Sequence, residues 1–233
     1  TEDIRYYRHD GVDFYGLGRA IFYLGKRGGG STITQQLAKL LFTSEYESTG
    51  FIERALLQKP KEWIIASRLE AHYTKGEIMT LYFNRYDFLN QAVGIHSAAS
   101  VYFNKSVSDL NMEESAMLVG MLKNSALYNP LRREELVTRR RNVVLGQMKK
   151  YGFITPEVSD SLQALPISLS YQRVSHAEGY APYFRENLRA KLKKIFNEKN
   201  SDGTYVISQA DGSKYDIYRD GLQVHTTLDS RLQ

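Results

Sequence analysis

Hydrophobic and polar residues alternate at helical spacing over the first two-thirds of the chain. This pattern predicts a series of helices, which cover residues 14–24, 51–73, 116–122 and 133–151. Thr74 and Asn111 each precede a glutamate by three residues, which is the spacing of a capping box at the start of a helix. Pro60 falls inside the second predicted helix and indicates a kink or a break there.

The pattern changes after Pro166. One more helix fits residues 182–196, and polar turns that contain glycine then separate short alternating runs at 205–208, 214–218 and 222–227. Such runs are typical of strands in a small β element. We therefore expect a mainly α domain over residues 1–165 and a segment over 166–233 with one helix and short strands.

Composition changes this picture only slightly. The 233 residues are 42% hydrophobic and 24% charged, as in ordinary globular proteins. The net charge of +5 favours an anionic partner, such as nucleic acid, a phosphate-bearing substrate or an acidic membrane surface. There are no cysteines, which excludes disulfides and thiolate metal sites. Both ends of the chain lie within apparently structured motifs, so we expect a piece of a longer protein.

The first candidate for chemistry is the glycine-rich loop before residue 31. A helix is predicted to start at Ser31 or Thr32, and its exposed N–H groups and positive dipole end favour an anion. Gln35 and Gln36 add amide donors, and Lys39 lies about one turn further on. A P-loop is excluded because the Gly-Lys-Ser/Thr ending is absent. A plain connector with an ordinary N-cap explains these residues equally well.

The second candidate is a group of charges in the second predicted helix. Arg54, Lys61 and Arg68 follow one another at intervals of seven residues, so they can share a face, and Lys59 and Glu62 lie between them. Clustered cations beside a carboxylate suit the binding of pyrophosphate. A solvated face of ion pairs is the commoner explanation for such a pattern.

The third candidate is a carboxylate pair near an imidazole. Glu2 and Asp3 precede His9, and such a group is suited to acid–base work. A surface acidic pair and a histidine with satisfied hydrogen bonds are the commoner explanation of such a pattern. The five histidines of the chain lack the spacing of metal ligands. Because Glu2 lies near a chain end, we expect it to fray.

Taken in order, these segments resemble the family 51 peptidoglycan glycosyltransferases. Residues 2–11 are similar to the first motif of the family, and residues 29–36 match the second in full. In the third motif Lys59 and Glu62 match, while Gln58 replaces an arginine. Further similarities lie at 77–84, 92–103, 124, 128–130 and 140–142. The end of the chain, 221–229, resembles the passage into the transpeptidase domain of class A penicillin-binding proteins.

The resemblance implies a lysozyme-like fold and a bifunctional class A protein that is cut before its second enzyme. It also implies a reaction, the polymerisation of lipid II into β-1,4 glycan with inversion and release of undecaprenyl pyrophosphate. Glu2 would be the general base, and Glu62 would order the cations or the acceptor site. The implied substrate-binding residues are Ser31, Gln35, Gln36, Lys39, Arg54, Lys59, Arg68, Asn124 and Arg140.

The resemblance further implies that Mg²⁺ or Mn²⁺ bridges the substrate pyrophosphate, with no metal site built by the protein. The implied partners are lipid II, lipid-linked glycan, the membrane surface and cell-wall synthesis proteins, but not nucleic acid. The domain would work on the periplasmic side of a bacterial cytoplasmic membrane, with its anchor absent from this chain. Two alternatives are a lysozyme-like hydrolase, which does not explain residues 29–36 or the cations, and a non-catalytic cell-wall scaffold.

Overall fold

The computed structural model describes residues 2–22, 30–43, 58–172, 181–210, 212–217, 220 and 222–226. The chain divides into two compact units, Thr1–Arg173 and Val174–Gln233. Helices make up most of the described residues of the first unit, and the second unit adds one long helix, so the prediction of a mainly α protein is confirmed. Among the described residues, no helix has the length and apolar character needed to cross a membrane.

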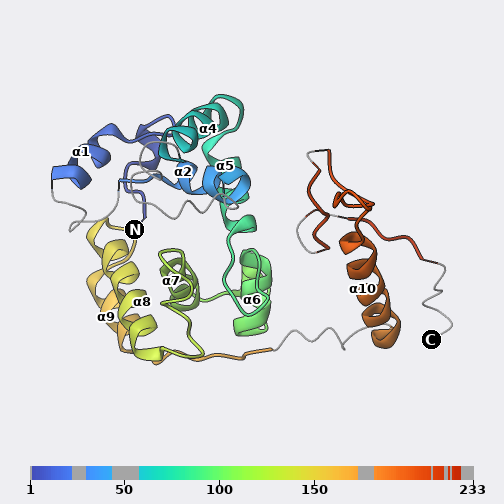
Figure 1. Ribbon diagram of the computed structural model, residues 1–233. Helices are drawn as coiled ribbons and strands as arrows, with labels where there is room; N and C mark the ends of the chain where they lie inside the picture. The colour runs from blue at the N-terminus through green and yellow to red at the C-terminus, as the bar shows by residue number, and fades with distance from the viewer. Residues whose placement is uncertain are drawn as a thin grey trace. The chain divides into compact units, whose positions relative to one another are not determined.

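The helices of the first unit form two groups (Figure 1). The first group and its short turns comprise η1 (Tyr6–Arg8), α1 (Phe14–Phe22), α2 (Ile33–Ala38), η2 (Lys39–Thr43), α4 (Lys59–His72) and α5 (Lys75–Arg85). The second comprises α6 (Ile95–Phe103), η4 (Val107–Asp109), α7 (Met112–Met121), α8 (Glu134–Lys150) and α9 (Pro156–Ala164). Within these groups, α2 packs against α4 and α5, and α7 packs against α8.

Local capping signals start several of these helices. Thr74 and Glu77 form both hydrogen bonds of a capping box at α5, and Asn111 and Glu114 do the same at α7. Both predicted boxes are therefore confirmed. At α2 the cap is Thr32, whose hydroxyl accepts a hydrogen bond from a backbone N–H one turn further on.

Pro60 lies in the first turn of α4, which begins at Lys59, so its missing N–H removes no hydrogen bond from this helix. The start of α4 at this point agrees with the predicted break. The part of the predicted helix at 51–57 lies outside the described residues, as does the end of the first predicted helix at 23–24.

A single apolar core connects the two groups. Leu37 of α2, Tyr82 of α5, Tyr102 of α6 and Leu118 of α7 are fully buried in it. The segment after α9 also belongs to this unit, because Ile167, Leu169 and Tyr171 pack against the same core. Its backbone donates hydrogen bonds to carbonyls of α6, from Ser170 to Tyr102 and from Gln172 to Val101. Because elements from the whole unit meet in this core, it fixes their relative positions.

The second unit contains α10 (Pro182–Asn197) followed by tight turns. Its described residues form isolated antiparallel bridges, one between Lys199 and Tyr205 and one between Ser208 and Lys214. The runs predicted as strands at 205–208 and 214–218 therefore begin at single bridges rather than in a paired ladder. Short two-stranded pairings are marginal on their own, since they have little apolar surface to bury.

Candidate active site

The N-terminal segment is folded around the start of α2. One carboxylate oxygen of Asp3 accepts a hydrogen bond from the backbone N–H of Ile33 at 3.2 Å and lies 3.0 Å from Nε2 of His9. The side chains of Asp3 and His9 are each only 5% exposed. Asp3 and His9 thus form a buried pair that anchors the segment on α2, so Asp3 is not part of a surface acidic pair.

Gly11 brings the same segment close to α4. Its φ of +92° is in the left-handed region, and a Cβ at this position would lie 2.8 Å from the carbonyl of Ala66. Its own carbonyl accepts hydrogen bonds from Thr32 Oγ1 at 2.6 Å and from Gln35 Nε2 at 3.2 Å. A glycine is required here because the backbones of two segments are in contact.

Buried polar groups tie the segment to α4 and α5 as well. The Tyr6 hydroxyl donates to the carbonyl of Lys75 at 2.7 Å. The Lys75 ammonium in turn donates to Glu70 at 2.8 Å and to the carbonyl of His9 at 2.5 Å. Thr34 of α2 donates to the same Glu70 oxygen at 2.6 Å. Sequence reasoning missed Glu70 and Lys75, because nothing in their spacing links them to the N-terminal segment.

This scaffold places Glu2 beside α8 of the second helix group. Its carboxylate forms an ion pair with Arg140, 138 residues away in sequence, and the two side chains are 17% and 11% exposed. Burial, followed by the nearby charges of Tyr86 and Glu2, raises the pKa of the Tyr82 hydroxyl. Glu2 therefore lies close to a buried phenol of α5. The expected fraying is not observed, because Arg140 holds the carboxylate.

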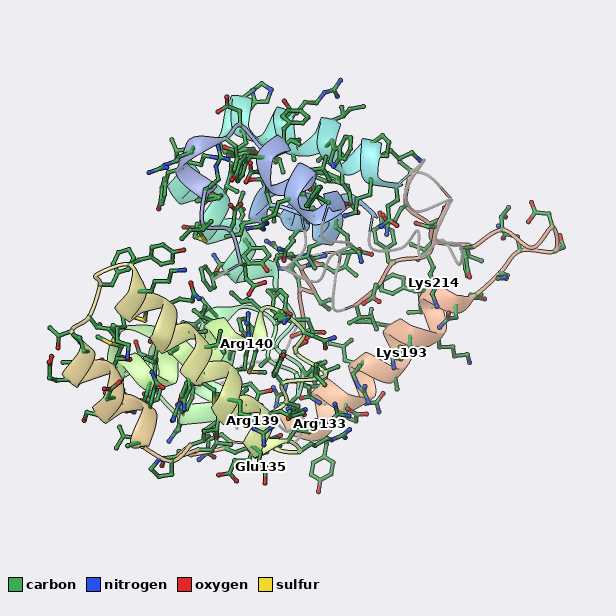
Figure 2. All side chains as sticks on the ribbon, turned by 90° about the vertical axis from the view of Figure 1, so that its left-hand side faces the viewer. Arg133, Glu135, Arg139, Arg140, Lys193 and Lys214 are labelled. Atoms are coloured by element: carbon green, nitrogen blue, oxygen red, sulfur yellow. The ribbon has the colours of Figure 1, made fainter. Side chains whose placement is uncertain are left out.

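Arg140 itself is fixed by two further groups. Its Nε donates to the carbonyl of Gly120 at 3.3 Å, and its guanidinium carbon lies 5.8 Å from the centre of the Tyr128 ring. Figure 2 shows Arg140 closer to the first helix group than Arg139 of the same helix. The next residue, Arg141, is buried and donates to the carbonyls of residues 163, 165 and 166. Adjacent arginines of α8 thus serve different parts of the unit.

A second cluster lies where α4 begins. The Lys59 ammonium donates to Glu62 Oε2 at 2.6 Å and to the Ser31 hydroxyl at 3.1 Å. Glu62 is 1% exposed and Lys59 keeps 35% of its side chain exposed. The other oxygen of Glu62 and the amide oxygen of Gln58 are buried without a hydrogen-bond partner among the described residues. Buried acceptor oxygens usually have a hydrogen-bond partner, so these two are exceptions among the described residues.

The structure places the remaining predicted residues as follows. Gln35 is buried against Gly11, and the Gln36 amide oxygen accepts a hydrogen bond from the Tyr82 hydroxyl at 2.9 Å. Asn124 caps a turn by accepting from the backbone of Leu127 at 2.8 Å. Two of the predicted cations reach the surface: Lys39 on η2 is partly exposed, and Arg68 on α4 is exposed. Arg54 lies outside the described residues.

Two clusters of predicted residues thus form, Glu2 with Arg140, and Ser31 with Lys59 and Glu62. In the first an arginine holds a carboxylate, which suits the removal of a proton. In the second a lysine lies over a buried carboxylate, which suits the binding of an anion. The transglycosylase family matches residues 1–149, and the chain belongs to that family.

Similar proteins agree with this assignment. Penicillin-binding protein 1A of Pseudomonas aeruginosa is 38% identical over 237 residues, and its namesake in Escherichia coli (strain K12) is 35% identical over 237 residues. Penicillin-binding protein 2a of Streptococcus pneumoniae (serotype 2) is 33% identical over 233 residues. These alignments cover 100% of this chain and 26%, 25% and 29% of the respective relatives. The chain thus spans about a quarter of the length of the curated relatives it matches.

A crystal structure of penicillin-binding protein 1A from Haemophilus influenzae is also similar. The sequence identity is 32% and the TM-score is 0.43. The match covers 55% of this chain and 18% of that chain.

Proposed function

We propose that this domain polymerises lipid II into β-1,4-linked glycan, as the glycosyltransferase part of a bifunctional penicillin-binding protein. The observation that carries the proposal is the ion pair of Glu2 with Arg140, because it holds in a fixed position a carboxylate that can accept a proton from a hydroxyl. Membership of the transglycosylase family and relatives named as penicillin-binding proteins support it.

In the proposed reaction Glu2 is the general base. Its carboxylate removes the proton from the 4-hydroxyl of the acceptor as that oxygen attacks the anomeric carbon of the donor. The new C–O bond forms while the bond from this carbon to the pyrophosphate oxygen breaks, so the proton ends on Glu2 and the electron pair leaves with the pyrophosphate. Attack from the opposite face converts the α-linked donor into a β-linked product.

Lys59 is the proposed cation for the departing undecaprenyl pyrophosphate. Glu62 and Ser31 fix its ammonium, while a third of the side chain stays accessible. Pyrophosphate is already a good leaving group, so no general acid is needed, unlike the carboxylate pair of glycosidases. Lys39, Arg68 and Arg54 are proposed as further cations for the donor. Gln35, Gln36 and Asn124 complete the proposed substrate-binding set.

The donor set of this cluster does not fit a metal ion held by the protein. The described residues include no group of three or more carboxylate, imidazole or thiolate side chains in suitable positions. The one buried carboxylate, Glu62, already pairs with Lys59. We propose that Mg²⁺ or Mn²⁺ is instead bound by the pyrophosphate oxygens of the substrate, where it would neutralise part of their charge.

We place the reaction on the outer side of a bacterial cytoplasmic membrane. The substrates would be lipid II and lipid-linked glycan, and the partners would be cell-wall synthesis proteins. Helix α1 supports contact with a lipid surface, since Phe14, Tyr15 and Phe22 are 73%, 70% and 80% exposed. Large apolar side chains with such exposure are typical of surfaces that bind another apolar phase.

Polymerisation of labelled lipid II by the full-length protein tests the proposal. The protein should make long glycan strands, and moenomycin, a phosphoglycolipid that mimics the donor, should inhibit it. A hydrolase would shorten finished glycan without lipid II, and a scaffold would neither polymerise nor shorten it. Either of these results would overturn the proposed function.

A further inference from the structure

We propose that Arg140 acts on the reaction through Glu2 rather than through the substrate, and that Gly120 of α7 is required for this. The inference rests on the proposed function, in which Glu2 is the base. It departs from the expectation that Arg140 binds sugar or phosphate. Arg140 is thus a positioning residue, and Gly120 provides the space in which its side chain lies.

The contacts of Arg140 leave little of it for a ligand. Its Nη2 donates to Glu2, its Nε donates to the carbonyl of Gly120, and its guanidinium lies over the ring of Tyr128. Its side chain is 11% exposed. Arginine binds phosphate most strongly through two parallel N–H groups of its fork. In Arg140 one terminal nitrogen of the fork, Nη2, is already occupied by a carboxylate of its own chain.

Gly120 allows α7 and α8 to approach closely at this point. A Cβ on Gly120 would lie 3.1 Å from Cγ of Arg140, which is closer than an ordinary van der Waals contact. Glycine inside a helix is less favourable than alanine, so the close contact is the physical reason for its presence. Any larger residue would push the stem of Arg140 aside and move its guanidinium relative to Glu2.

Three distant segments therefore assemble the base. The N-terminal segment contributes the carboxylate, α8 contributes the cation, and α7 contributes the space and the acceptor carbonyl. The orientation of Glu2 is determined by the packing of α7 against α8. Small displacements of a reacting group are costly, because proton transfer depends on short distances and correct angles.

The first experiment compares Arg140→Met and Arg140→Lys in the full-length protein. Arg140→Met should lower kcat for lipid II about 100-fold while KM changes less than about twofold. Arg140→Lys should recover part of kcat, because it restores the charge without the fork.

Binding of moenomycin separates the two possible roles of Arg140. If Arg140 acts only on Glu2, the affinity of Arg140→Met for moenomycin should stay within about twofold of the wild type. A loss of affinity of about tenfold or more would assign Arg140 to the donor site and overturn the inference.

The second experiment compares Gly120→Ala with Gly146→Ala. Gly146 lies inside α8, and a Cβ there would have no heavy atom within 4 Å, so it is a matched control for the gain in helix propensity. Gly120→Ala should lower kcat about tenfold without lowering Tm, and Gly146→Ala should leave kcat unchanged. If Gly120→Ala keeps the kcat of the wild type, Gly120 has no role in positioning the base.

A double-mutant cycle keeps this inference separate from the proposed function. Glu2→Gln, Arg140→Met and the double variant should show non-additive changes in Tm, because each single change removes the same ion pair. Additive changes in Tm would overturn the pairing whether or not the protein is active. A wild-type protein that does not polymerise lipid II would overturn the proposed function alone. An active wild type together with an unchanged kcat in Arg140→Met would overturn the positioning role.

Discussion

The two clusters of the site differ in how many of their polar side chains have a hydrogen-bond partner within the protein. The base cluster, formed by Glu2, Arg140 and their neighbours Asp3 and Tyr82, has a partner for each of these four polar side chains. The donor cluster, formed by Ser31, Gln58, Lys59 and Glu62, keeps two buried acceptor oxygens without partners among the described residues. The four named side chains of the base cluster are thus paired before a ligand binds, although Nδ1 of His9, which contacts Asp3, is buried without a partner among the described residues. In the donor cluster the two unpaired atoms belong to the cluster's own side chains.

The difference agrees with what the two halves of the proposed reaction require. Removal of a proton depends on a fixed geometry between base and hydroxyl, so preorganisation of the base is useful. A lipid pyrophosphate is flexible and multiply charged, and it brings its own hydrogen-bonding groups. A binding cluster whose polar groups are completed by the ligand gains specificity, because a wrong ligand leaves those groups unpaired. Four predictions test this comparison.

The largest effect is expected at the base. Glu2→Gln should lower the rate of lipid II polymerisation about 10³-fold, because the amide cannot accept the proton. The initial rate with labelled lipid II measures this. Glu135→Gln on α8 is the control, since its side chain is 89% exposed and its contact is an ion pair within the helix. A Glu2→Gln variant within tenfold of the wild type would remove Glu2 from the role of base.

Lys59→Met should have the next largest effect. It removes the proposed cation of the leaving group, so kcat should fall about 100-fold. It also leaves the buried carboxylate of Glu62 unpaired, which should lower the stability by about 2 kcal/mol after allowance for the exposed part of Lys59. Lys61→Met removes the same charge from an exposed position on the same helix and should retain most of the activity and stability. Equal losses in both variants would mean that net charge, rather than the contacts of Lys59, matters.

Asp3→Ala tests the anchor of the base cluster. The variant loses the carboxylate that caps the backbone of Ile33 and contacts His9, so stability should fall by about 1–2 kcal/mol. The rate should fall less than in Glu2→Gln, because the base itself remains. Chemical denaturation and the polymerisation assay measure the two effects. Asp10→Ala, an exposed neighbour, should change neither of them. An unchanged stability in Asp3→Ala would show that the anchor contributes little.

The smallest expected effects are changes in stability, and these should have opposite signs in the two clusters. Tyr82→Phe removes a hydroxyl that is paired with Gln36 and should lower stability by about 1 kcal/mol. Gln58→Met removes an unpaired buried amide oxygen and should raise stability by about 1 kcal/mol, while it weakens the use of lipid II. Thermal unfolding of both variants gives the comparison. A loss of stability in Gln58→Met would show that the protein itself satisfies this amide, and the contrast between the clusters would fail.

Much of the fold was predictable from the sequence because its signals are local. The capping boxes at Thr74 and Asn111 act over three residues, and the apolar spacing of each helix acts over one or two turns. The ordered motifs also indicated the family, since they preserve residue types at short spacings. Pro60 indicated a break in the predicted helix by an equally local signal, and α4 begins beside it, at Lys59.

The roles of single site residues depended on contacts that no local spacing reveals. Asp3 with His9 has the composition of an acid–base group, yet burial against α2 makes it an anchor. Arg140 and Arg141 are adjacent and chemically identical, and only the packing of α8 turns one toward Glu2 and the other toward the carbonyls after α9. The sequence by itself thus determined the helices, the family and the residue types of the site. Only the tertiary structure decided that Glu2 meets Arg140, because that pairing joins segments 138 residues apart.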